Sequence, residues 1–81
     1  MRKINGIIIM ATEEAVKFVG RVLKDTVLID RAVHANKERA EIIMQAITEY
    51  YSSGCYEKAI FWTDELYRLA GYNFVRRVKV E

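Results

Sequence analysis

The chain contains no proline, and its apolar residues recur at intervals of three, four and seven over most of its length. Proline breaks helix interiors, so its absence permits long helices, and this spacing gathers apolar side chains on one helix face. The pattern predicts helices over 12–24, 26–52 and 56–70, with an allowed break near Ala35 and Asn36 in the second. We therefore predict a mainly α fold of three to four helices.

Polar residues and glycines mark the expected helix ends. Thr12 has the chemistry of an N-cap, Asp25 reads as a stop and a new cap, and Asn36 could open a fresh helix. Gly54 and Gly71 follow two apolar runs, where glycine supplies the left-handed geometry that closes a helix.

The two ends of the chain favour strands. The isoleucine-rich segment 4–10 predicts one short buried strand, with a helical extension or the apolar part of a signal sequence as weaker interpretations. The tail 73–80 alternates apolar and basic residues, which is typical of a strand with a basic outer face. A lone strand is unstable, so we expect these segments to pair as a short two-stranded sheet formed by the termini.

Size and composition limit the classes of function. With 81 residues the chain makes one domain, 1–81, and its net charge of +2 is too small to imply a nucleic acid or an anionic membrane as partner. Cys55 is the only cysteine, which excludes an internal disulfide and suits a reducing compartment such as the cytoplasm. We expect no membrane insertion, metal or cofactor.

Signals of catalysis are weak. The glycines do not form a phosphate-binding motif, and the charged pairs Glu38/Glu41 and Asp64/Glu65 read as solvated helix faces. His34, the only histidine, could meet Asp30 on a helix or Cys55 through the fold. A small structural cysteine is the better interpretation, so we predict that the chain is not an enzyme.

Aromatic residues are concentrated in the second half of the chain. They are Tyr50, Tyr51, Tyr56, Phe61, Trp62, Tyr67, Tyr72 and Phe74. A chain this small cannot bury eight large rings fully, and tyrosine and tryptophan are favoured at interfaces. The candidate partner-binding residues are Tyr50, Tyr51, Tyr56, Trp62, Tyr67 and Tyr72, with Trp62 and Tyr67 as anchors. The alternative is that the rings join two helices and the tail.

These rings predict a regulator or adaptor that binds a protein partner. Because a domain of this size is marginally stable, a homodimer is also expected.

Basic residues at both ends provide a second hypothesis. Arg2, Lys3, Arg76, Arg77 and Lys79 could contact nucleic acid. The alternative is a solvated strand face whose charges prevent edge-to-edge aggregation, and this alternative is favoured because few cations are present.

One segment also carries a family pattern. It comprises Tyr50-Tyr51-Ser52-Ser53-Gly54-Cys55-Tyr56-Glu57-Lys58-Ala59-Ile60 and Leu66-Tyr67-Arg68-Leu69-Ala70. Residues 40–73 resemble one tetratricopeptide (TPR) repeat, with departures at Ile47, Thr63 and Gly71. The resemblance implies an antiparallel helical hairpin and a protein-binding module. One repeat cannot bury its own face, so the upstream helix, the tail or a second subunit would have to cover it.

Overall fold

The structure, a computed structural model, describes residues 2–72 and 77–81. In this part of the chain the helices are α1 (Thr12–Val22), α2 (Thr26–Ala35), α3 (Lys37–Ser52) and α4 (Tyr56–Leu69). The strands are β1 (Arg2–Ile4), β2 (Ile7–Met10) and β3 (Val78–Val80). The predicted mainly α fold with a small sheet formed by the termini is confirmed.

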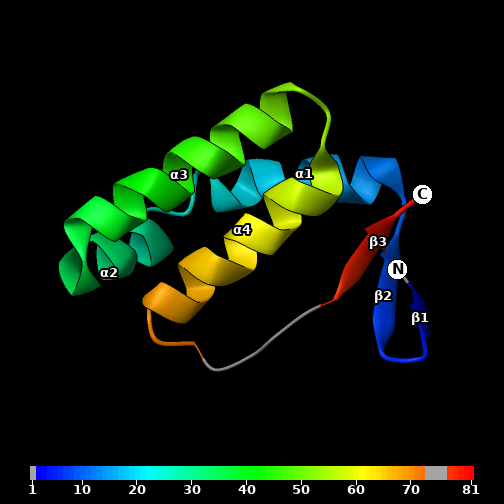
Figure 1. Cartoon of the computed structure of the whole chain (residues 1–81), viewed down its shortest axis with the longest axis horizontal. Helices are drawn as coiled ribbons and strands as arrows, with labels where there is room; N and C mark the ends of the chain where they lie inside the picture. Colours follow the sequence, from blue (N-terminus) through cyan, green and yellow to red (C-terminus); the bar gives the residue numbers. More distant parts are fainter. Residues whose placement is uncertain (1, 73–76) are drawn as a thin grey trace.

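Helices α3 and α4 form an antiparallel hairpin, and α1 and α2 cover one side of it (Figure 1). Helix α4 is central, because it contacts the other three helices and also β3. The core between the helices is closed to solvent. Its fully enclosed residues include Ala15, Val19, Ala32, Ala40, Ile43, Ile47, Ala59 and Leu66.

The helix boundaries follow local chemistry at most ends. Asp25 caps α2 by accepting from the Leu28 N–H at 3.1 Å, and Asn36 caps α3 by accepting from the Arg39 N–H at 3.1 Å. The break at Asn36 therefore separates α2 from α3. The predicted cap at Thr12 is wrong, because Ala11 takes the N-cap position and the Thr12 hydroxyl donates to the Glu81 carbonyl oxygen at 2.7 Å.

The predicted single strand over 4–10 is also wrong. The segment is a hairpin in which β1 pairs antiparallel with β2, and Ile4 lies opposite Ile7. Asn5 and Gly6 form the connection, with φ of 51° and 79°. Both central residues of a type I′ turn need positive φ, and Asn-Gly is the pair that tolerates this best. The isoleucines thus belong to two strands.

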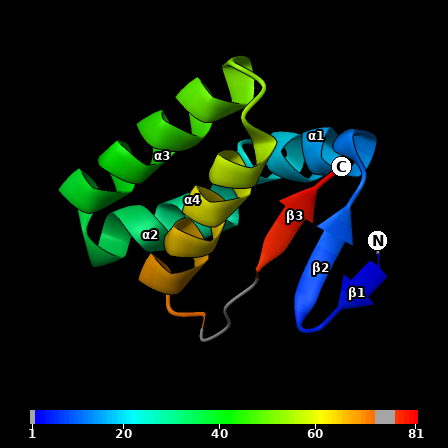
Figure 2. The ribbon, with the colours of Figure 1, turned by 45° about the vertical axis from the view of Figure 1, so that its right-hand side comes forward.

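The tail completes the sheet. Strand β3 pairs in parallel with β2, so that Ile8 lies opposite Val78 and Met10 opposite Val80. The strand order is β1-β2-β3, and β3 lies on the side nearest α4 (Figure 2). The predicted pairing of the two termini is confirmed for Val78–Val80. The first part of the predicted tail strand, 73–76, lies outside the described residues.

Candidate protein-binding site

The predicted interface rings are half-buried. Tyr50, Tyr51, Tyr56, Trp62, Tyr67 and Tyr72 all pack against the core cluster while part of each remains accessible. Phe74 lies outside the described residues. The rings therefore help to join the helices, and each keeps an edge that a partner can reach.

Tyr51 is held mainly by contacts within the chain. Its hydroxyl donates to the Val16 carbonyl oxygen at 3.3 Å, and its ring packs edge-on against Tyr56 with centroids 6.1 Å apart. A Cβ at Gly20 would come within 3.2 Å of the same hydroxyl oxygen. Glycine at this position therefore lets α3 come close to α1, and this part of the aromatic set is structural.

Tyr67 and Tyr72 lie at the other end of α4. Their ring centroids are 5.5 Å apart in an edge-on arrangement. The Arg31 guanidinium lies 4.8 Å from the centre of the Tyr72 ring and also donates to its hydroxyl oxygen at 3.1 Å. These contacts connect the end of α4 to α2.

The most exposed described ring is Phe61, which is 58% exposed on α4. Trp62 meets it edge-on at a centroid distance of 5.7 Å, and the Arg39 guanidinium lies 5.9 Å from the centre of the Trp62 ring. These three residues, Arg39, Phe61 and Trp62, are called the Phe61 face below. Tryptophan, arginine and an exposed aromatic ring are the residue types that most often anchor protein interfaces.

Phe61 was absent from the predicted interface set. The sequence held a signal for it, since Phe61 has Lys58 three residues before it and Glu65 four residues after it on the same side of a helix. An aromatic ring between two charged neighbours on one face lies on the solvent side. The number of aromatic residues alone could not show which ring is exposed to solvent.

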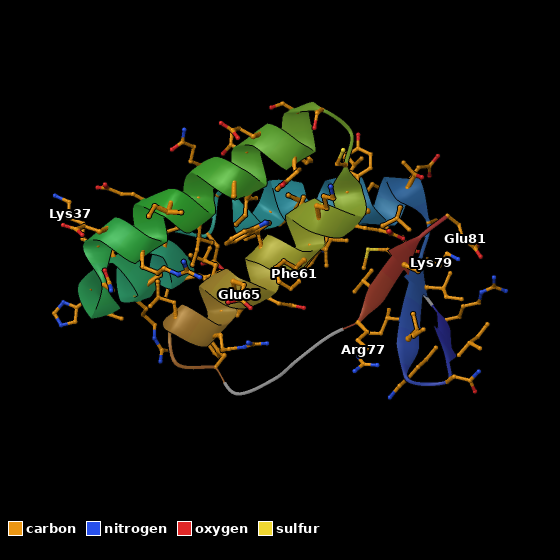
Figure 3. The ribbon with its side chains drawn as sticks, viewed as in Figure 1. Lys37, Phe61, Glu65, Arg77, Lys79 and Glu81 are labelled. Carbon is orange, nitrogen blue, oxygen red and sulfur yellow. The ribbon has the colours of Figure 1, made fainter. Side chains whose placement is uncertain are left out.

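A groove separates α4 from β3 next to Phe61. It has a volume of about 370 Å³ and is lined by Glu57, Ile60 and Phe61 of α4 and by Arg77 and Val78 at the start of β3. Figure 3 shows Phe61 and Glu65 on one side of α4 and Arg77 across from them at the start of β3. This space is called the β3 groove below.

The charged groups at the β3 groove differ in their surroundings. Asp64 was expected at the surface but is only 3% exposed, so that expectation is wrong. Glu65 pairs with Arg68 at 3.2 Å, and the Glu57 carboxylate accepts from the Val80 N–H at 2.8 Å. Arg77 is exposed. The groove therefore presents the exposed charges of Glu57 and Arg77 and an aromatic ring beside an apolar floor.

The described basic residues of the two termini share the small sheet. Arg2 and Lys3 lie on β1, Lys79 lies on β3, and Arg77 directly precedes it. Arg2 forms an ion pair with Glu81 at 2.9 Å. Arg76, the fifth predicted contact, lies outside the described residues.

The charge of the chain is divided unevenly. Residues 11–72 carry ten Asp and Glu against eight Lys and Arg, whereas residues 2–10 and 77–81 carry four Lys and Arg against one Glu. The sheet is therefore the basic end of the described chain.

The structure does not bring the candidate catalytic residues together. His34 lies near the start of α3 and Cys55 follows its end, so the 16 residues of α3 separate them by roughly 24 Å. The considered Cys-His pair is therefore wrong.

Within residues 2–72 and 77–81, His, Cys, Asp and Glu do not gather in groups of three that could hold a metal ion. The helices described there are also too short or too polar to cross a bilayer.

Comparisons with protein-family models, with curated proteins and with solved structures found no match for this chain.

Proposed function

We propose that this chain is a small adaptor or regulator, without enzymatic activity of its own, that binds another protein through the α3–α4 hairpin. The observation that carries the proposal is Phe61, a large ring 58% exposed beside Trp62. Exposed aromatic area is unfavourable in water, and its burial by a partner stabilises a complex by roughly 25 cal/mol per Å² of apolar surface.

The surroundings of Phe61 support this proposal. Arg39 and Lys58 each lie over an aromatic ring, those of Trp62 and Tyr50, so the cations and rings form one continuous side of the hairpin. Arginine and tryptophan in contact are typical of interface hot spots. The TPR resemblance remains a proposal that agrees with this function, since such repeats bind proteins. A cytoplasmic location agrees with the single cysteine.

Affinity capture from an extract of cells that make this protein tests the proposal. The wild-type chain is compared with Phe61→Ala and Trp62→Ala, and with Val27→Ala as the matched control. Val27 is 67% exposed but lies on α2, and not on the hairpin that carries Phe61 and Trp62. We expect a partner that the wild type and Val27→Ala retain and that Phe61→Ala loses by at least about tenfold.

Thermal unfolding of each variant shows whether it has kept its fold. Equal retention of every captured protein by folded Phe61→Ala and wild type would contradict the proposal. Light scattering on the purified chain tests the proposed homodimer separately, because a mass of one chain at all concentrations would exclude it.

A second candidate function is binding of nucleic acid by the sheet. The observation that favours it is the clustering of Arg2, Lys3, Arg77 and Lys79 at one end of the molecule. Binding would weaken with salt, by about 0.9 log units per log unit of salt for each duplex phosphate contacted. Fluorescence anisotropy with a labelled oligonucleotide measures this directly.

The matched variants for that experiment reverse charge at two sites. Lys79→Glu should weaken binding and flatten the salt dependence, whereas Lys24→Glu, at an exposed position beyond the end of α1, should change it little. Absence of binding at low salt would remove this candidate.

A further inference from the structure

Among the strands of residues 2–72 and 77–81, β3 is the last in the sheet, and none of them covers its second edge. The Ile8 N–H donates to the Arg77 carbonyl oxygen at 2.7 Å, and the Glu81 N–H donates to the Met10 carbonyl oxygen at 3.0 Å. Residues 77 and 81 therefore direct their backbone groups toward β2. Because backbone groups alternate along a strand, those of Val78 and Val80 point to the opposite edge.

On this edge the backbone N–H of Val80 has a hydrogen-bond partner, whereas the backbone groups of Val78 do not have one among the described residues. The Val80 N–H donates to Glu57 of α4, which occupies that donor. Among the described residues, none pairs with the N–H or the carbonyl oxygen of Val78. Unpaired donors and acceptors on a strand edge are a template for an added strand.

The β3 groove lies directly beside this open position. Val78 lines it from the strand, and Ile60 and Phe61 line it from α4. A volume of about 370 Å³ can take one or two side chains of a bound segment. One extended segment could therefore make both contacts: its main chain would pair with Val78, and one of its apolar side chains would pack against Phe61.

The charged groups around the groove show where it can accept an acidic side chain. Glu65 is paired with Arg68, and Asp64 is buried and has a partner. Glu57 is exposed and accepts from the Val80 N–H, a neutral donor that leaves its negative charge in place. Arg77 is exposed and has no ion-pair partner among the described residues, so an acidic side chain of a bound segment would be stabilised next to Arg77 and not next to Glu57.

We propose that the open edge of β3 and the β3 groove bind an extended segment of the partner protein as a fourth strand, with an acidic side chain of that segment opposite Arg77. The proposal rests on the proposed protein-binding function and names the form of the partner. Main-chain hydrogen bonds to Val78 would set the register, an apolar side chain would pack on Ile60 and Phe61, and an acidic side chain would meet Arg77.

Selection from displayed short linear peptides of random sequence tests this inference. We expect enriched peptides with an apolar residue two positions from an acidic one, because side chains two apart share one face of a strand. Binding of a synthesised, labelled peptide should fall about tenfold or more in Phe61→Ala. It should fall several-fold in Arg77→Glu, with a weaker dependence on salt.

Two backbone changes test the strand pairing itself. Val78→Pro removes the edge N–H but no bond to β2, so the sheet should persist while the peptide is lost. Methylation of alternate amide nitrogens of the peptide provides the second test on the unaltered protein. Methyl groups on the edge that faces β3 should abolish binding, and those on the other edge should leave it unchanged.

The outcomes separate this inference from the proposed function. Peptides that depend on Trp62 but not on Val78, or that tolerate methylation on both edges, would overturn the fourth strand and leave the Phe61 face as the binding surface. If no peptide is enriched but a captured partner still requires Phe61, the fourth strand would also be excluded and the Phe61 face would remain the binding surface. A wild-type dimer that Val78→Pro converts to monomer would assign the edge to a second copy and also overturn the inference.

Discussion

The helical part and the terminal sheet of this molecule are stabilised in different ways. The helices enclose a core in which residues such as Val19, Ile43 and Ile47 have no exposed surface. In the sheet only Met10 is buried, and all of β1 is exposed. Most of the apolar area removed from water therefore belongs to the helices, and the sheet depends on them through β3 and α4. A substitution in the helices should therefore lower the stability of the whole chain, whereas a substitution in the sheet should affect only the strands.

The largest expected effect is a cavity in the helical core. Ile47→Ala should lower the free energy of unfolding by about 2–5 kcal/mol, because it removes buried carbon atoms and leaves a void. Denaturant unfolding followed by circular dichroism measures it. Ile42→Ala is the control, since Ile42 is 55% exposed on the same helix, and its effect should be within about 0.5 kcal/mol. Similar losses for both would contradict the assigned core.

Two glycines test whether a backbone change stays local. Gly6 and Gly54 have φ of 79° and 80°, and a Cβ at either would meet no atom within 4 Å. Alanine at either position should cost about 1–2 kcal/mol from backbone geometry alone. Gly54→Ala should lower the stability of the whole chain.

Gly6→Ala should instead reduce hydrogen-exchange protection in β1 and β2 and leave α3 unchanged. Loss of protection in α3 by Gly6→Ala would show that the sheet and the helices unfold as one unit.

The helix caps give a smaller effect. Asn36→Ala removes the acceptor for the Arg39 N–H and should cost about 1 kcal/mol. Thr12→Ala should cost less, because Thr12 contacts the Glu81 carbonyl oxygen and does not cap α1. Thermal unfolding of the two variants side by side measures the difference. An equal or larger loss for Thr12→Ala would mean that the sheet contributes more to stability than its burial indicates.

The smallest effect is expected where the two parts meet. Glu57→Gln keeps an oxygen acceptor for the Val80 N–H but removes its charge, so it should weaken that hydrogen bond by a few tenths of a kcal/mol. Faster amide exchange at Val80, seen by nuclear magnetic resonance, would report this change. Glu65→Gln is the control and should leave Val80 unaffected, because Glu65 pairs with Arg68.

The helices could be predicted because their signals are local. Apolar spacing, the caps at Asp25 and Asn36 and the glycines at 54 and 71 each act within a few residues. The turn at Asn5 and Gly6 was equally local, but the run of isoleucines was interpreted as one strand and the Asn-Gly signal was overlooked.

Other features depend on contacts far apart in the chain. Asp64 is buried on the side of α4 that, with Val78, lines the β3 groove, and no pattern within α4 shows where β3 will pack. The candidate site was predicted in part for the same reason. The concentration of rings was visible in the sequence, and so were the charged neighbours Lys58 and Glu65 of Phe61, whereas the groove next to that ring depends on where β3 packs.

The parallel pairing of β2 with β3 also affects how the molecule is made. Ile8 lies opposite Val78, so its partner is synthesised only after the four helices described above. During translation the β1–β2 hairpin lacks its β3 partner, so the backbone groups on one edge of β2 stay unpaired. The contacts between the helices are closer in sequence and can form earlier. We therefore expect the sheet to close after the helices have assembled, so that a nascent chain stalled before residue 78 would hold the helices without β3.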